Sequence, residues 1–333
     1  MLGGGFSWFA NQYGWTCDSV LEFEIVTPDA KIFQVNSEKN SDLFWALKGS
    51  LGAFGILTRI KVPTLRNRGV YGGGIAYEQD AAPALFAALE KLNREADSDP
   101  KTQGYISFAW LEQQEKYVYS AYLLNTDGKS DGVAFEDFSM IPHTHNGLNN
   151  MTLGKSAEEI NDSNPLGYRR CKFTITVRNS AEVMESLHTI FRNTVSDMRE
   201  GYGFDATGIL AMTFQPLTVP HMNAGDNIFK FSPQEGAPTD DEPLIMVSAE
   251  VWWTDAEKDA YLQQQLYYIW DSFVFSMAWI EALHPFVYPN YAAKWQKPFE
   301  YLANKTLERL ASVRKEHDPE DVWQRLVPGI FHI

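Results

Sequence analysis

Two glycine runs are the first features of the sequence that could support chemistry. Gly3–Gly5 are consecutive, and Gly49, Gly52 and Gly55 are spaced three residues apart. Glycine lets backbone N–H groups approach a bound ligand closely, although tight turns are the commoner reason for such runs. Neither run matches the phosphate-binding pattern G-x-x-x-x-G-K-[ST] or a dinucleotide fingerprint that follows a strand. The runs alone therefore do not indicate an ATP or NAD site.

A carboxylate within an apolar strand pattern is the second candidate. Glu250 lies in the segment Val-Ser-Ala-Glu-Val-Trp-Trp, residues 247–253. A carboxylate in such a place can face a substrate and act as a general acid or base. It can equally be the outward-facing polar residue of an alternating strand. The sequence leaves both interpretations open.

The histidines and cysteines indicate little by their spacing. His143 and His145 are two residues apart and could bind a metal from one face of a strand, but we expect solvated loop histidines. Cys17 and Cys171 are the only cysteines, which excludes a disulfide framework and a cysteine-rich zinc site. No base accompanies Cys17 in the sequence, so we do not interpret it as a nucleophile.

Composition and charge exclude several classes of protein. The 333 residues are 44% apolar and 14% aromatic, which is enough for a large core and two domains. Lys and Arg number 28 against 43 Asp and Glu, so the net charge of −15 repels nucleic acid. No window approaches about 18 uncharged apolar residues, so we expect no membrane span. The first residues lack a secretion signal, so we expect an intracellular protein if Met1 is the true start.

Residues 1–67 have a β-rich pattern with one short helix. Alternating segments at 20–26 and 31–35, separated by Pro28 and Asp29, predict a β-hairpin. Ser41 is the predicted cap of a helix over 42–47. After the second glycine run, residues 56–62 predict a strand that ends at Pro63.

Residues 68–283 predict an α+β domain, in which an antiparallel sheet is backed by helices on one side. Strands are expected at 105–111, 117–124, 171–177, 209–214 and 244–253, and a helix at 81–95. Asn179 is the predicted cap of a helix that ends near 198. Thr254 and Glu257 form a predicted capping box for a helix from 255 to 283, and 125–168 is expected to be loop-rich.

Residues 284–333 form a third segment. An aromatic, proline-broken loop at 287–292 precedes a predicted helix over 300–317, which Asp318 and Pro319 end. The last residues are expected to form a compact tail.

The order of these motifs resembles one protein family over nearly the whole chain. The segments Gly3–Ser7, Tyr13–Val20, Asp42–Gly49 and Phe54–Thr58 resemble the second half of the flavin-binding domain in FAD-linked oxidases of the berberine-bridge-enzyme-like type. Tyr288-Pro-Asn-Tyr-Ala resembles that family's Tyr-x-Asn-Tyr loop, and residues 317–329 resemble its terminal tail. The resemblance implies FAD as cofactor, with 1–67 as part of the PCMH-type FAD-binding domain. It also implies that residues 68–283 form the substrate domain and that residues 284–333 form a segment that returns to the FAD domain.

The resemblance assigns roles to individual positions. It implies that Gly3, Gly4, Gly5 and the turn from Asp18 to Val20 lie against the flavin, that the backbone of Phe54, Gly55 and Ile56 holds the adenine end of FAD, and that Asn290 and Tyr291 touch the isoalloxazine or its ribityl chain. Tyr288 matches a tyrosine that some relatives use as the base for a substrate hydroxyl. A phenol of pKa near 10 needs a positive or polar neighbour to serve at neutral pH.

The chain departs from the family pattern before its first glycine run. No Arg-Ser-Gly-Gly-His-like segment, which in the family carries the flavin-attaching histidine, exists in this sequence. We therefore expect a chain that lacks the N-terminal part of the FAD domain. Gly49-Ser-Leu-Gly replaces a richer glycine and asparagine loop, and Ala293 stands where an acid often follows the tyrosine motif.

Three hypotheses on function follow. The first is an FAD-linked oxidoreductase that oxidises a small secondary metabolite or closes a ring in it. The second is a flavin-free isomerase or cyclase in which Glu250 or Tyr288 donates a proton. The third is an inactive remnant or binding partner. The sequence identifies neither the substrate nor the oligomeric state.

Overall fold

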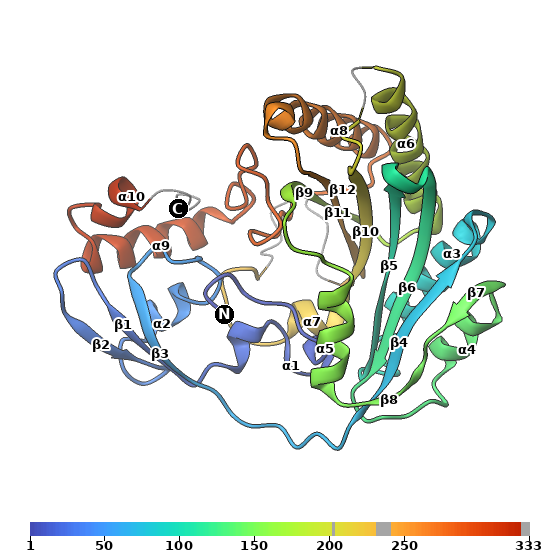
Figure 1. Cartoon of the computed structure of the whole chain (residues 1–333). Helices are drawn as coiled ribbons and strands as arrows, with labels where there is room; N and C mark the ends of the chain where they lie inside the picture. Colours follow the sequence, from blue (N-terminus) through green and yellow to red (C-terminus); the bar gives the residue numbers. More distant parts are fainter. Residues whose placement is uncertain (202–203, 231–240, 328–333) are drawn as a thin grey trace. The chain divides into compact units, whose positions relative to one another are not determined.

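The computed structural model describes residues 1–201, 204–230 and 241–327, and it divides the chain into two compact units (Figure 1). Unit 1 consists of Met1–Arg66, Val219–Asp241 and Lys294–Ile333. Unit 2 consists of Asn67–Thr218 and Glu242–Ala293. No helix in the described part of the chain combines the length and apolar character that a bilayer crossing requires.

The division differs from the predicted boundaries at two places. Residues 219–230, which the sequence placed within the middle domain, lie in unit 1. There the Ile228 N–H donates to the Lys48 carbonyl (3.2 Å). Residues 284–293, placed by sequence in the third segment, lie in unit 2. There β12, Leu283–His284, pairs with β9, Arg169–Arg178, and forms one edge of the large sheet.

Unit 1 contains a three-stranded antiparallel sheet in the order β2-β1-β3. The predicted hairpin is present as β1, Glu22–Val26, and β2, Ile32–Val35, and β3 is Ile56–Lys61. Its helices are α1 Ala10–Tyr13, η1 Thr16–Ser19, α2 Ser41–Ala46, α7 Val219–Asn223, α9 Asn304–His317 and α10 Val322–Leu326.

The core of unit 1 lies between its sheet and α2. Alternation along β1 buries Phe23 completely, and its ring lies 5.7 Å from that of Phe44 on α2. On α9, the Arg309 guanidinium lies 4.0 Å from the Trp45 ring centroid and donates to the Asp42 carboxylate (2.7 Å). These contacts fix α2 between the sheet and α9. The last strand of the sheet and α9 are more than 240 residues apart in the sequence.

Unit 2 is built on one large antiparallel sheet, in the order β12-β9-β11-β10-β5-β6-β4-β7, with β8 paired to β4 (Figure 1). The strands are β4 Val70–Tyr77, β5 Thr102–Leu111, β6 Lys116–Asn125, β7 His143–Asn146, β8 Asn149–Met151, β9 Arg169–Arg178, β10 Ile209–Leu217 and β11 Leu244–Trp253. The α+β class with an antiparallel sheet, predicted from the sequence, is confirmed.

The helices of unit 2 are η2 Gln79–Ala81, α3 Ala82–Arg94, η3 Glu112–Gln114, α4 Val133–Met140, α5 Leu153–Asp162, α6 Ala181–Glu200, η4 Ala256–Lys258 and α8 Asp259–Trp279. One face of the sheet, here called the covered face, packs against α3, α6 and α8. Phe108 and Phe214 of the sheet meet Phe86 of α3 at ring distances of 5.5 and 5.7 Å. Phe173 of β9 meets Phe273 of α8 at 5.6 Å, and all five phenylalanines are at most 1% exposed.

The opposite face, here called the open face, carries polar side chains. Helix α5 lies over part of it, because the Tyr122 hydroxyl donates to Ser156 Oγ (3.1 Å) and Glu159 Oε2 (3.2 Å) of that helix. Tyr122 in turn stacks on its cross-strand partner Tyr105. The predicted arrangement, with helices on one side only, is therefore wrong for α5, whose sequence carries too few apolar residues to predict a packed helix.

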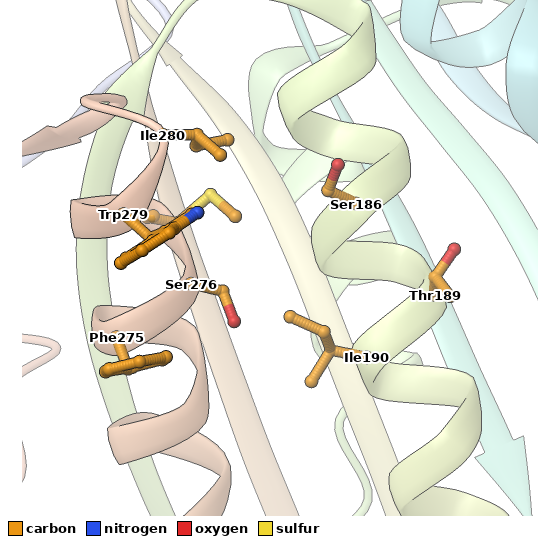
Figure 2. Close-up of a pocket in the computed structure, with 8 residues that line it drawn as sticks. Ser186, Thr189, Ile190, Phe275, Ser276, Trp279 and Ile280 are labelled. Carbon is orange, nitrogen blue, oxygen red and sulfur yellow. The ribbon is translucent and has the colours of Figure 1, made fainter.

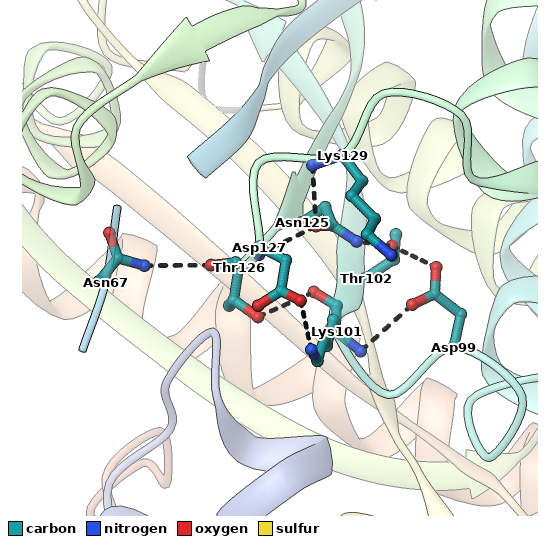
Figure 3. A network of polar contacts seen from close by, with 8 residues as sticks. All are labelled: Asn67, Asp99, Lys101, Thr102, Asn125, Thr126, Asp127 and Lys129. Atoms are coloured by element: carbon teal, nitrogen blue, oxygen red, sulfur yellow. Dashed lines mark hydrogen bonds and ion pairs between the residues drawn. The ribbon is translucent and has the colours of Figure 1, made fainter. Parts of the chain in front are cut away.

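A polar network closes the end of the sheet at which the chain enters unit 2 (Figure 3). The buried Asn125 side chain donates to Thr102 Oγ1 (2.9 Å), which itself donates to Asp99 Oδ2 (2.5 Å). The Asn125 side-chain oxygen accepts from the backbone N–H of Lys129 (3.2 Å). Asn67 donates to the Thr126 carbonyl (3.0 Å), so the first residue of unit 2 is fixed to the β5–β6 end. Buried polar groups in folded proteins are hydrogen-bonded, and these bonds satisfy the polar groups at this end of the sheet.

Helix boundaries differ from the predicted ones at several places. Asn40, not Ser41, is the N-cap position of α2, and the helix predicted over 300–317 begins at Asn304. Ser180, not Asn179, is the cap of α6, and its hydroxyl accepts from the Val183 N–H. The capping oxygen before η4 belongs to Asp255, not Thr254, and α8 ends at Trp279, well before residue 283. The predicted loop-rich segment 125–168 contains α4 and α5.

Candidate functional site

The open face of unit 2 brings polar side chains from five strands into ordered rows. The register places Ser120, Ser107, Thr213, Ser248 and Thr174 directly opposite one another across β6, β5, β10, β11 and β9. The Ser107 and Thr213 hydroxyls are 2.7 Å apart and form a hydrogen bond. Because residues opposite one another in a sheet share a face, the five hydroxyls form one line. Thr174 is buried and its hydroxyl donates to the Val247 carbonyl (3.0 Å), whereas the other four residues of the row are partly exposed.

Glu250 lies in the next row of this face. Its cross-strand partners are Ala211 on β10 and Lys172 on β9, and beyond Ala211 comes Ala109. The small alanines leave the carboxylate without a bulky neighbour on that side. The structure thus places Glu250 on the face that carries the polar rows.

The loop that carries the tyrosine motif folds against the open face. The Tyr291 hydroxyl donates to Gln215 Oε1 (3.3 Å), and the Lys172 ammonium lies 4.2 Å from the centroid of the Tyr291 ring. Tyr288 packs edge-on against Tyr291, with ring centroids 4.9 Å apart. The Asn290 amide donates to the Tyr288 hydroxyl at 2.6 Å. The polar neighbour that a catalytic phenol needs is therefore present at Tyr288.

Burial controls the ionisation of the groups around this loop. Burial raises the pKa of Tyr291, and the negative charge of Glu250 raises it further. Burial also raises the pKa of Tyr105, with smaller contributions from Tyr122 and Tyr291. Burial lowers the pKa of Lys172, an effect that Glu250 opposes. At neutral pH the Tyr291 and Tyr105 phenols are thus protonated, and the Tyr291 hydroxyl donates to Gln215.

Sequence reasoning missed Lys172, Gln215 and Tyr105. None belongs to a recognisable motif, and each lies on a different strand. Alternation within each strand predicts a shared face, but only the strand order shows that β9, β10 and β5 are close together. The available signal was Lys172 itself, since it is the charged residue of the alternating segment 171–177.

The glycines of unit 1 pack against the chain itself. Gly4 has φ +85°, and a Cβ on it would lie 2.6 Å from the Phe229 ring. Gly5 has φ +97°, and a Cβ there would lie 2.8 Å from Cβ of Thr16. Side chains of the protein thus explain both glycines without a ligand, and Gly3 beside them is buried. At Gly52, by contrast, a Cβ would meet no atom within 4 Å. The glycine runs therefore fit a cofactor-facing backbone only in part.

The turn from Asp18 to Val20 holds unit 1 together. Asp18 accepts from the Trp15 N–H (2.9 Å) and from the Asn227 amide (2.9 Å). Burial raises the pKa of Asp18, although the Asn227 hydrogen bond opposes the shift. Val20 is 3% exposed and ends η1. Burial also raises the pKa of the Cys17 thiol, which agrees with a structural cysteine rather than a nucleophile.

The third group of predicted cofactor residues lies where the second glycine run enters β3. Phe54 is buried, whereas Ile56 is 57% exposed and pairs with Val26 of β1. Gly55 has φ +151°, and a Cβ on it would lie 2.4 Å from the Val26 carbonyl oxygen. Close approach of two backbones therefore explains this glycine.

Two hollows lie on the helical side of unit 2. One, of 580 Å³, is lined by residues of α6 and α8, and Figure 2 shows Ile190 facing Phe275 and Trp279 across it. The other, of 610 Å³, is lined by residues that include Tyr117, His188 and Arg192. Both belong to the side of the sheet opposite the polar rows, so neither is part of the candidate site.

The predicted loop histidines lie on a strand. His143 and His145 are exposed residues of β7. Within the described residues, no group of three or more His, Cys, Asp or Glu side chains is arranged to hold a metal ion.

Comparison with known proteins gives two kinds of relative. No protein-family profile matches the chain. The chain is 26% identical over 337 residues to the oligopeptidase PhomG' of Diaporthe leptostromiformis, covering all of this chain and 27% of that protein. It is 26% identical over 342 residues to the FAD-dependent monooxygenase tpcD of Cochliobolus heterostrophus, covering 99% of this chain and 64% of that protein. The chain thus spans less than two thirds of the length of these relatives.

Solved structures show the same fold. The 6-hydroxy-D-nicotine oxidase of Arthrobacter nicotinovorans superposes with a TM-score of 0.73 at 17% identity, over 97% of this chain and 68% of that one. A cysteine-to-alanine variant of berberine bridge enzyme superposes with a TM-score of 0.66 at 17% identity, over 96% of this chain and 68% of that one. The chain therefore has the fold of berberine-bridge-enzyme-like FAD-linked oxidases and resembles FAD-dependent monooxygenases in sequence, as its motifs predicted.

Proposed function

We propose that this chain is part of an FAD-linked oxidoreductase that acts on a small secondary metabolite at the open face of unit 2. The observation that carries the proposal is the position of the tyrosine loop. Residues 288–291 lie against β9 and β10, which are 75 to 120 residues earlier in the sequence, and there they meet a face lined with hydroxyls, an amide, a lysine and a carboxylate. Such a set of convergent polar groups from distant strands is typical of a catalytic face.

FAD, when bound, would supply a two-electron acceptor for a hydride from the substrate. The residues of unit 1 that would hold it are those that the resemblance assigns: Gly3, Gly4, Gly5, Asp18, Val20, Phe54, Gly55 and Ile56. In unit 2, Asn290 and Tyr291 would contact it. The sequence similarity to FAD-dependent monooxygenases supports this assignment.

Proton transfer is the part of the reaction that the chain's own residues perform. Oxidation of an alcohol releases a proton from the hydroxyl as the hydride leaves carbon, so a base must lie within hydrogen-bond reach. Tyr288 suits this role because the Asn290 amide already donates to its oxygen and would stabilise a phenolate. Glu250 is the second candidate base, since it lies on the open face beside two alanines.

Flavin binding is the direct test of the cofactor. The purified chain would be incubated with FAD, freed of unbound flavin by gel filtration, and examined for flavin absorption in the protein fraction. FMN and riboflavin serve as matched controls, because they lack the adenine end that residues 54–56 are proposed to hold. Retention of FAD but of neither control supports the proposal. A protein that remains colourless at about 100 μM FAD, a concentration well above typical cofactor dissociation constants, would count against it for this chain.

The catalytic assignments need a second measurement. Removal of a general base lowers turnover by about 10²–10⁴-fold. We expect Tyr288→Phe or Glu250→Gln to show this loss on the substrate that the oxidase turns over, with Thr189→Val, at an exposed position of α6 on the other side of the sheet, as the control. An enzyme that turns a substrate over while colourless would instead support a flavin-free isomerase or cyclase.

A further inference from the structure

Positive charge gathers at one end of the open face. Arg170 and Lys172 are two residues apart on β9, so their side chains leave the same face about 7 Å apart along the strand. Their cross-strand partners on β11 are Trp252 and Glu250. Two cations beside one carboxylate leave an excess of one positive charge at this end, in a chain whose net charge is −15.

Aromatic rings hold both cations in place. The Arg170 guanidinium lies 3.7 Å from the Trp252 ring centroid, and it also donates to the Pro165 carbonyl. The Lys172 ammonium lies 4.2 Å from the Tyr291 ring centroid. Cation–π contacts orient a charged group without neutralising it. Both cations therefore keep a full charge to offer to an anion.

Lys172 lacks an acidic partner in contact. It is partly buried, yet among the described residues no carboxylate lies within 4 Å of its ammonium, and Glu250 acts on it only through space. A lysine held away from water without a paired acid is costly to retain. By comparison, the neighbouring Arg169, on the other face of β9, forms an ion pair with Asp259.

Arg178 on β9 and Lys116 on β6 also share this face by alternation, and both are positive, so neither pairs with Arg170 or Lys172. Glu159 of α5 meets Tyr122 on β6, which is four strands from β9 and so about 19 Å away. His284 shares the face with Thr176, but burial lowers its pKa to about 4, so it is uncharged at neutral pH. The face is thus polarised, with positive charge at β9 and negative charge at the α5 end.

We infer that the substrate carries one acidic oxygen group, a carboxylate or an ionised enol, which Arg170 and Lys172 bind at the β9 end of the open face. This inference rests on the proposed function, because it specifies the substrate class of the same face. The anion would sit between the two cations, and the uncharged part of the substrate would extend over Ala211 and the hydroxyl row toward Tyr105. Charge-assisted hydrogen bonds from lysine and arginine make such recognition strong.

Binding of acid and amide pairs by the flavin-free chain tests the inference. The probes are 2-naphthoate with 2-naphthamide, and cinnamate with cinnamamide, measured by calorimetric titration. Each pair has the same shape and differs by one negative charge. We expect at least one acid to bind about tenfold more tightly than its amide, which corresponds to one charge-assisted contact. If no acid binds better than its amide, the inference is wrong.

Variants separate recognition from structure. Lys172→Met and Arg170→Met keep an apolar stem but remove the charge, and each is expected to bring the acid-to-amide affinity ratio close to one. Lys172→Arg should retain the preference. Lys155→Met on α5 is the matched control, since Lys155 is exposed and paired with Glu158. A merely structural role for Lys172 would weaken acid and amide equally and so would contradict the inference.

The outcome is distinguishable from that of the flavin test. A chain that prefers acids but does not retain FAD would uphold the substrate inference and count against the cofactor. A chain that retains FAD but shows no preference for acids would support the cofactor and contradict the substrate inference.

Discussion

The two faces of the unit 2 sheet differ in role, although the same strands form both. One face packs against helices and stabilises the fold, and the other carries the polar groups of the candidate site. On β10, Phe214 is fully buried against Phe86 and Phe108, whereas the adjacent Thr213 points to the other side and bonds Ser107. The covered face buries phenylalanines under three helices. The open face carries hydroxyls, Glu250 and Lys172. Two neighbouring residues of one strand therefore lie on different faces, one in the apolar core and one on the polar face, because side chains alternate between the faces.

The largest expected effect is on the covered face. Phe214→Ala removes a fully buried ring and should lower the free energy of unfolding by about 3–5 kcal/mol. Thr213→Ala, one residue earlier, removes one hydroxyl pair and should cost about 1 kcal/mol. Chemical denaturation followed by tryptophan fluorescence and by circular dichroism measures both. Equal losses for the two variants would contradict the division between the faces.

A buried histidine makes the covered face sensitive to acid. His188 of α6 bonds the Tyr119 hydroxyl (2.7 Å) and packs on Phe86 and Phe108, and burial, with a smaller effect of Arg192, lowers its pKa to about 4. The unfolded chain takes up this proton near pH 6.5, but the folded protein does so only near pH 4. The stabilisation is therefore complete above pH 6.5 and is lost as the pH falls toward 4.

The His188→Gln variant isolates this contribution. Between pH 7 and pH 4.5 the unmodified protein should lose about 2.5 kcal/mol more stability than the variant. His284 and His221 titrate in the same direction in both proteins, and Asp18 in the opposite one, so the difference reports His188. Parallel pH profiles for the two proteins would show that His188 is not held neutral.

The sequence predicted β1, β2, β3, β5, β6, β9, β10 and β11 to within a few residues, because alternation marks each of these strands locally. It missed β4, whose centre is three glycines, and the short strands β7, β8 and β12. It also predicted the fold through its motifs, and it singled out Glu250, Tyr288, Asn290 and Tyr291, which lie together in unit 2. It could not predict that Lys172 meets Tyr291, since that contact depends on strand order. Nor could it place α5 on the open face, since the bonds from the Tyr122 hydroxyl to Ser156 and Glu159 depend on the tertiary structure.

The open face should tolerate loss of one hydrogen bond. Tyr291→Phe removes the bond to Gln215 but keeps the ring under Lys172 and against Tyr288. The free energy of unfolding should fall by only about 1 kcal/mol. In the acid and amide titrations, the preference for acids should persist, because the cation–π contact remains. Loss of that preference in Tyr291→Phe would show that the hydroxyl, not Lys172, recognises the charge.

The smallest expected effect concerns the start of α6, the helix that carries His188. Both Asn179 and Ser180 are good capping residues by type, but only the Ser180 hydroxyl accepts from the Val183 N–H (3.4 Å). At that length the bond is weak, so Ser180→Ala should cost about 0.5–1 kcal/mol. Asn179 instead donates to the Glu90 carbonyl of α3 (3.0 Å) and lies beside Asn93. Asn179→Ala should therefore destabilise the packing of α3 against α6 rather than the helix end. The two losses should add in the double variant, since the residues serve different contacts. A double variant no less stable than the Asn179→Ala single would show that Ser180 caps nothing.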